Sequence, residues 1–306
     1  MQKEFLVSVA GGLLSALMTS AILLNSGVGI LLGYFGLLPI IFVGFSSGLR
    51  YLAIASCFCI ASLLFFSNQV QAILYFFSMV IPAILICYLV LSRRSINAEP
   101  SDGLEIGQVL AALALLGITY LLTSLAFFTD GSLNLEERIK EMLNKVFYER
   151  MQIASAVDRK LLIGTIIPYF PSLIASSWFI MILVNAFLAQ KILIGMGKNI
   201  RPEVKYSLIS APNWLYWVFA FFGIISLFSR DEIEFITQNA CIISAIPFFL
   251  IGLTVFNYLA KKTKAPKTVL FIFYIFLSIS SWAIAICTII GFFEEWLRLR
   301  RKYSLE

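Results

Sequence analysis

The sequence predicts an all-α fold, a polytopic bundle of eight or nine transmembrane helices, and two features of its composition support this class. Apolar residues make up 60% of the 306 residues, and the mean hydropathy is +0.92. Charged residues make up 13%, whereas an ordinary soluble domain carries roughly 25%. So few charges cannot cover the surface of a soluble protein of this length, which excludes a soluble enzyme, a disordered chain and a secreted disulfide scaffold.

Nine segments are apolar enough to be membrane spans, and a transmembrane helix needs about 20 such residues. None of the nine contains Asp, Glu, Lys or Arg. The third is short, so we expect it to be tilted or joined to a neighbour as a broken helix. The nine segments are residues 5–24, 27–46, 51–66, 70–92, 106–128, 165–190, 212–229, 235–258 and 268–293.

Lysine and arginine between the spans indicate orientation, because the cytoplasmic side carries more of them. With nine spans, twelve fall on the side of the N-terminus and eleven on the other, so the overall bias is weak. Over the first eight spans the bias is stronger, and we place the N-terminus in the cytoplasm. The last segment lies between the basic stretches 261–267 and 298–302, so charge alone does not orient it.

The segment 134–154 is too polar to be a span and has the pattern of an amphipathic helix. Asn134 is in position to cap it, and Glu137 follows three residues later, as in a capping box. Such a helix would lie in the membrane interface or over the bundle, either as a connection or as a lid or partner surface. Its apolar stripe consists of Leu135, Ile139, Met142, Leu143, Val146 and Phe147.

Small residues at intervals of four form stripes on the first two spans. In lipid such stripes let helix backbones approach closely, so each is either a packing face within the chain or a docking face for a partner. The residues are Ser8, Gly12, Ala16 and Ser20 on the first span, and Gly44 and Gly48 near the end of the second.

Five prolines lie in or near the spans. They predict interruptions of the helices, since proline removes one backbone N–H from the hydrogen-bond ladder. Broken helices frame the binding sites of many transporters, but a proline also produces a simple kink. The residues are Pro39, Pro82, Pro168, Pro171 and Pro247.

Several kinds of chemistry are missing from the sequence. There is no histidine, so His-based metal sites and general bases are excluded. The spans hold no charged residue, which argues against proton-coupled antiporters, pumps and intramembrane proteases. No Walker A loop and no continuous basic face for nucleic acid are present. We therefore expect no catalytic residue, cofactor or metal and no enzymatic activity, and the five cysteines, all inside apolar segments, predict no disulfide.

Three polar residues are candidates for ligand contact. Arg50 is the only charged residue between Phe5 and Ser92 and could meet an anionic ligand, although an interfacial anchor is the plainer interpretation. Asn185 and Asn257 lie in late spans, where a buried amide either binds a ligand or joins two helices by a hydrogen bond.

Several stretches together resemble the YybS-like family of predicted bacterial membrane proteins. Near the end of the chain, Glu294 or Glu295 stands where that family usually has an Asp. The stretches are 37–40 with Gly44, Gly48 and Arg50; Pro171, Trp178 and 185–191; 201–202 and 212–214; 247–252; and 291–301.

The resemblance implies a function as well as a fold. The N-terminal part of such proteins is similar to the substrate-binding subunits of energy-coupling-factor transporters, so residues 1–128 are expected to form a comparable bundle. Residues 129–164 would connect it to C-terminal spans and a basic tail in 165–306. We expect a multi-pass protein of the bacterial inner membrane that binds a largely neutral small molecule and takes energy from a separate ATPase. The alternatives are a non-catalytic scaffold that binds cell-envelope or division proteins, and a lipid-handling protein.

Overall fold

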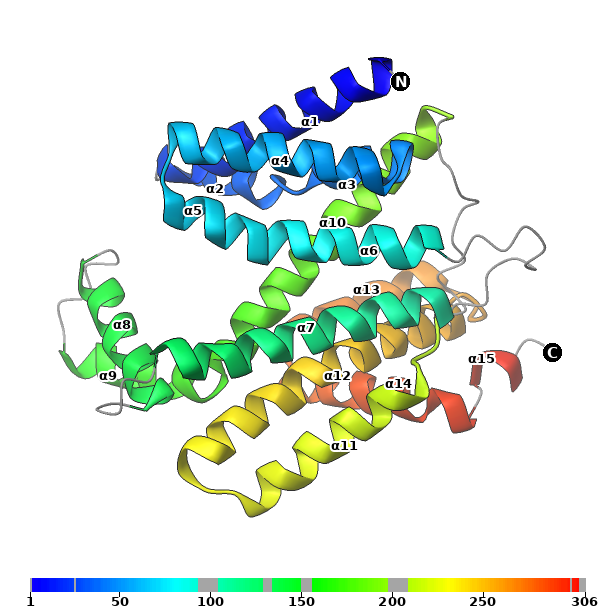
Figure 1. Ribbon diagram of the computed structural model, residues 1–306. Helices are drawn as coiled ribbons and strands as arrows, with labels where there is room; N and C mark the ends of the chain where they lie inside the picture. The colour runs from blue at the N-terminus through cyan, green and yellow to red at the C-terminus, as the bar shows by residue number, and fades with distance from the viewer. Residues whose placement is uncertain are drawn as a thin grey trace. The chain divides into compact units, whose positions relative to one another are not determined.

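The computed structural model describes residues 2–24, 26–92, 104–128, 134–149, 156–197, 209–297 and 299–302. Within these residues all regular structure is helical and no strand occurs (Figure 1), which confirms the predicted all-α class. All five cysteines lie in the described residues and are free, so the prediction of no disulfide is also confirmed.

The helices of the described residues differ in length and in type. Two of the short elements are 3₁₀ helices and η2 is a π-helix. In chain order the elements are α1 (Gln2–Ser20), η1 (Ala21–Leu24), α2 (Gly27–Tyr34), α3 (Leu38–Ser47), α4 (Leu49–Phe66), α5 (Gln69–Tyr75), η2 (Phe76–Val80), α6 (Ile81–Ser92), α7 (Leu104–Phe128), α8 (Leu135–Glu149), α9 (Ala156–Ile166), η3 (Ile167–Tyr169), α10 (Phe170–Gly195), α11 (Asn213–Phe228), α12 (Asp231–Ala260), α13 (Pro266–Ile279), α14 (Ser281–Leu297) and α15 (Leu299–Lys302).

Seven helical segments in the described residues are long and apolar enough to cross a membrane, and a bent pair, α13 with α14, makes up to eight. The structure therefore agrees with at most eight spans, the lower of the two predicted numbers. The segment expected at 212–229 forms α11, which has 16 residues and is shorter than the other spans. The third span, expected to be tilted or joined to a neighbour as a broken helix, is the continuous 18-residue helix α4. An interruption lies in the second span, between α2 and α3.

The chain divides into two compact units, and each contains residues from distant parts of the sequence. Unit 1 consists of Met1–Val109 and Trp178–Lys205, and unit 2 of Leu110–Ser177 and Tyr206–Glu306. Helices α7 and α10 therefore pass from one unit into the other. The division of the sequence at residues 128 and 164 stays a prediction.

In unit 1, α1 packs on α3 and α4. The closest approach is at Gly12, where a β-carbon would lie 2.3 Å from the backbone oxygen of Ala55. Ser8 and Ala16 are buried on the same face of α1, and Ser20 is half-buried. The small-residue stripe of the first span is therefore packed against helices of its own unit.

In unit 2, α12 is the central helix and packs on α11 and α14. A β-carbon on Gly291 would lie 1.8 Å from the backbone oxygen of Phe248, so α14 lies directly against the backbone of α12. Aromatic rings fill the space beside this contact, with Tyr216 of α11 within 5.2 Å of the ring centres of Phe248, Phe292 and Trp296.

Helix α8 has the amphipathic character that the sequence predicts for this segment. The Asn134 backbone N–H donates to Glu137 Oε2 over 3.1 Å, which is one half of a capping box. Leu135, Leu143 and Phe147 are buried against other residues of unit 2. Helix α8 ends at Glu149, and residues 150–154 of the predicted segment lie outside the described residues.

Candidate functional site

The second span of unit 1 is interrupted in its middle, and this interruption is the centre of the candidate site. Helix α2 ends at Tyr34 and α3 begins at Leu38, with Pro39 in the first turn of α3. Because Pro39 has no backbone N–H and the chain turns at residues 35–37, the helical hydrogen-bond ladder stops there. Backbone carbonyls at the break then need partners from side chains, since lipid supplies none.

Two side chains from other helices supply these partners. Asn185 of α10 donates from Nδ2 to the Tyr34 carbonyl over 2.9 Å, and to Met181 O of its own helix over 2.7 Å. The Ser15 hydroxyl of α1 donates to the Gly36 carbonyl. Ser15 Oγ also pairs with the Tyr75 hydroxyl, and since the Ser15 proton is used on Gly36, Tyr75 is the donor of that bond.

A second irregular segment lies next to Tyr75. The π-helix η2 follows it directly, and such bulges often occur at functional sites. Trp178 of α10 donates from its indole Nε1 to the carbonyl of Ser78 within η2 over 2.7 Å. Trp178 and Asn185 are seven residues apart and so share a face of α10. That face therefore stabilises both irregular segments of unit 1.

Two buried polar atoms at the break have no hydrogen-bond partner among the described residues. They are Asn185 Oδ1 and Thr19 Oγ1. Asn185 is 0% exposed and Thr19 is 7% exposed. The assignment of the Asn185 oxygen follows from its surroundings, because both neighbours of Nδ2 are carbonyls and require a donor. Thr19 Oγ1 lies against Gly36, within 2.5 Å of the position of a β-carbon on that residue.

We call Ser15, Thr19, Tyr34, Gly36 and Asn185 the break site. Of its residues only Asn185 was predicted to contact a ligand. Ser15 and Thr19 were missed, although their spacing of four on the first span is a signal that two hydroxyl groups share a helix face. Ser56 Oγ, on α4, is a further buried hydroxyl of unit 1 without a partner in the described residues.

The other two predicted ligand residues lie elsewhere. Arg50 is exposed at the start of α4 and lines an open pocket of about 510 Å³ with Phe5, Leu6 and Tyr51. Asn257 is half-buried in unit 2, where its Nδ2 donates to Leu253 O and to the Tyr274 hydroxyl, each over 2.8 Å. The structure thus does not bring Arg50, Asn185 and Asn257 together.

Two further glycines predicted to pack helices differ from each other. A β-carbon on Gly44 would lie 2.6 Å from both Cys87 Sγ and Leu52 Cδ1, so Gly44 is a close contact between helices. Gly48 has no atom within 4 Å of that position and has a φ of +93°. Its role is the turn between α3 and α4, which requires the left-handed conformation that glycine tolerates.

Asn239 of unit 2 provides a fully bonded counterpart to Asn185. Its Oδ1 accepts from the Ser172 N–H over 3.0 Å, and its Nδ2 donates to Pro168 O and Phe235 O over 2.9 and 2.8 Å. The Asn239 amide therefore bonds to backbone groups at the start of α10, and both its oxygen and its nitrogen have hydrogen-bond partners. Among the described residues no group of three or more Cys, Asp or Glu side chains is arranged to hold a metal ion.

Comparison with known proteins agrees with the membrane architecture. Neither the curated proteins nor the solved structures give a match. A family model described as "Predicted membrane protein (DUF2232)" matches residues 13–294, which include every residue of the break site. The chain is thus an integral membrane protein with several membrane-spanning helices, and it belongs to the DUF2232 family of predicted membrane proteins.

Proposed function

We propose that unit 1 binds a small molecule at the break site, as the membrane-embedded binding subunit of a transport system. The observation that carries this proposal is the pair of buried atoms without partners among the described residues, Asn185 Oδ1 and Thr19 Oγ1, on residues that both contact the same helix interruption. A buried polar group left unbonded costs about 1–3 kcal/mol, and such groups in a folded protein call for an explanation. A ligand that bonds to both atoms provides one.

The residues of the break site indicate the chemistry of the ligand. Asn185 Oδ1 can only accept a hydrogen bond, so the ligand presents a donor such as a hydroxyl or an amide N–H. The Thr19 hydroxyl can donate or accept. The buried polar side chains described in unit 1 are serine, threonine and asparagine, without a charged one. Because a charge in the membrane needs a partner, a neutral ligand fits this site best.

The interrupted helix supports transport as the purpose of binding. Discontinuous helices place backbone polar groups at the bilayer midplane in many transporters, where they contact the substrate. The sequence has no Walker A loop, and in this proposal a separate ATPase supplies the energy. The bacterial inner membrane is the location that goes with this role.

A scaffold for envelope or division proteins has less support. The amphipathic helix α8 was the main candidate for a partner surface. Its residues Leu135, Leu143 and Phe147 are buried within unit 2, so these three already have partners in the chain, and of the same stripe Met142 and Val146 are exposed.

The proposal can be tested by native mass spectrometry of the full chain, extracted from bacterial membranes in mild detergent. We expect the wild-type protein to carry a neutral small molecule and Thr19→Val to lose it, because valine keeps the shape of the side chain but removes the hydroxyl. Thr119→Val is the matched control, since the Thr119 hydroxyl is exposed and bonds to Leu115 O of its own helix. A wild-type protein without any bound molecule, or full retention by Thr19→Val, would contradict the proposal.

A further inference from the structure

The last apolar segment of the sequence is not a straight span. Helices α13 and α14 meet at Ser280 and are bent by 115°. Since this bend exceeds a right angle, α14 turns back against the direction of α13, and its Gly291 lies against Phe248 in the middle of α12. With 14 and 17 residues, the two helices are about 21 and 26 Å long at 1.5 Å per residue, and the bend keeps them from adding up to one straight span.

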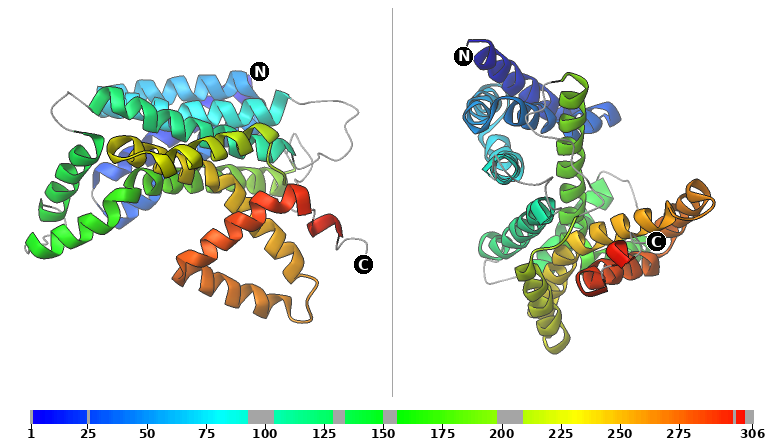
Figure 2. Two further views of the ribbon diagram at one scale, coloured as in Figure 1. Left: turned by 90° about the horizontal axis from the view of Figure 1, so that it is seen from below. Right: turned by 90° about the vertical axis from the view of Figure 1, so that its right-hand side faces the viewer.

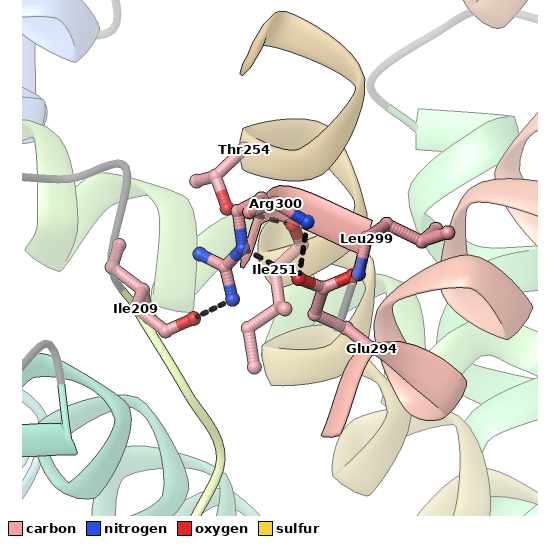
Figure 3. A network of polar contacts seen from close by, with 6 residues as sticks. All are labelled: Ile209, Ile251, Thr254, Glu294, Leu299 and Arg300. Atoms are coloured by element: carbon pink, nitrogen blue, oxygen red, sulfur yellow. Dashed lines mark hydrogen bonds and ion pairs between the residues drawn. The ribbon is translucent and has the colours of Figure 1, made fainter. Parts of the chain in front are cut away.

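Contacts within unit 2 show at which end the returning helix finishes. Helices α11 and α12 are joined by Ser229 and Arg230 alone, so they form a hairpin. The start of α11 lies away from this turn, beside the middle of the longer α12, where the Tyr216 ring contacts Phe248. Arg300 follows α14 and donates from Nη2 to the carbonyl of Ile209, just before α11, over 2.8 Å (Figure 3). Helices α12, α13 and α14 accordingly form three sides of a triangle (Figure 2).

Glu294 fixes this arrangement at the end of α14. It is 6% exposed, and its carboxylate accepts from Arg300 Nε over 2.8 Å and from the backbone N–H groups of Leu299 and Arg300 over 3.2 Å. A buried, charge-assisted pair of this kind holds both side chains in one geometry. The start of α15 is therefore held against the segment that leads into α11.

The two ends of α12 carry opposite charge. The α11–α12 turn is followed by Asp231, Glu232 and Glu234. The connection from α12 to α13 and the first turn of α13 together carry four exposed lysines, and no Asp or Glu occurs between residues 235 and 293. The four residues, called the lysine cluster, are Lys261, Lys262, Lys264 and Lys267.

The charge balance of the whole sequence changes if α13 and α14 do not cross the membrane. With a crossing, twelve lysines and arginines face eleven across the bilayer. If the segment returns, the four in residues 298–302 change sides, and sixteen face seven. The second distribution is the strong asymmetry that membrane proteins show between their cytoplasmic and outer sides.

We propose that α13 and α14 form a re-entrant hairpin, and that the lysine cluster at its base binds the head groups of anionic phospholipids. Helix α13 contains no buried residue, and Phe271, Phe276 and Ile279 are 67%, 51% and 81% exposed, which suits contact with acyl chains. Clusters of lysine directly beside a membrane helix bind anionic lipid surfaces. The hairpin lies in unit 2, so this inference is independent of ligand binding at the break site.

The topology is tested with the variants K264C, K302C and R230C of the full chain, labelled in right-side-out vesicles with a membrane-impermeant maleimide. The wild-type protein, labelled in the same way, gives the background signal from the five native cysteines. We expect K264C and K302C to be labelled only after the vesicles are opened, and R230C before. Labelling of K264C and K302C from opposite sides would show that the segment crosses the bilayer and would overturn the hairpin.

The lipid surface is tested by native mass spectrometry of the full chain in detergent mixed with phosphatidylglycerol or phosphatidylcholine. We expect the wild-type protein to retain phosphatidylglycerol preferentially, and the variant with Lys261, Lys262, Lys264 and Lys267 changed to Gln to lose that preference. The control changes the exposed Lys140, Lys145 and Lys160 to Gln and should keep it. Equal retention of phosphatidylglycerol by the quadruple variant and the wild type would overturn the lipid surface.

Discussion

Single polar side chains determine where the helices of unit 1 can be interrupted. Asn185 and Ser15 each bond to a carbonyl that the break between α2 and α3 leaves without a helical partner. Asn239 does the same for the start of α10 in unit 2, but there both ends of the amide are bonded. The difference between the two asparagines is the reason to regard the Asn185 oxygen as a ligand contact and Asn239 as structural.

Loss of the hydroxyl group should lower the stability of the protein at Ser15 but not at Thr19. Ser15→Ala removes the donor to Gly36 O and the acceptor for Tyr75, so we expect it to lower the free energy of unfolding by about 1–3 kcal/mol. Thr19→Val removes a group that has no partner among the described residues, and the ligand-free protein should lose no stability. Thermal unfolding in detergent measures both, and a Thr19→Val protein destabilised as much as Ser15→Ala would show that its hydroxyl has a structural partner.

The sequence identified only part of the break site, for a physical reason. A buried asparagine in an apolar span is conspicuous because its amide must be satisfied, and Asn185 was predicted on that ground. Serine and threonine in a helix commonly bond to a carbonyl of the preceding turn, as Ser8 does with Glu4 O. Ser15 and Thr19 look the same in the sequence, and only their neighbours in the fold distinguish them.

At the level of helices, α1 and α4 are held in contact by the absence of a side chain at Gly12. We expect Gly12→Ala to lower the free energy of unfolding by about 1–3 kcal/mol, the usual cost of adding volume to a packed contact, because its β-carbon would meet the backbone of Ala55. A side-chain neighbour could move aside more easily than this backbone oxygen.

The control for this change is Gly27→Ala in the same unit. Gly27 begins α2 and has no atom within 4 Å of the position of a β-carbon. Its replacement should leave stability unchanged or slightly raised. Comparison of the two midpoints of thermal unfolding in detergent checks the prediction, and equal midpoints would reject α1 against α4 as a tight contact.

Most helices could be predicted from hydropathy, whereas their interruptions could not. The hydropathy of a segment reports how many apolar residues it contains. Segments 27–46 and 268–293 are apolar enough to be predicted as spans whether their helices are straight or broken. Pro39 was recognised as a possible break, but a kink was equally consistent with it. The adjacent Ser280 and Ser281 allow a kink but do not specify a bend of 115°, because the contacts that hold α14 against α12 come from residues far apart in the chain.

For the whole molecule, the sequence predicted the class of protein but not how the chain is shared between its parts. Composition alone identified an integral membrane protein, and the family match agrees. The two compact units, in contrast, each combine an early and a late part of the chain. Asn185 reaches Tyr34 only because residues 178–205 belong to the same unit as the first four spans, and a pattern local in sequence cannot show such a pairing.

Ligand binding at the break site can be observed in an electron cryo-microscopy map of the full chain, purified in lipid nanodiscs without a step that strips bound molecules. We predict density for a small molecule within hydrogen-bond distance of Asn185 Oδ1 and Thr19 Oγ1, beside the break at Tyr34 and Gly36. A map in which these two atoms are bonded to protein groups, with no density between them, would contradict the assignment of this site as a binding site.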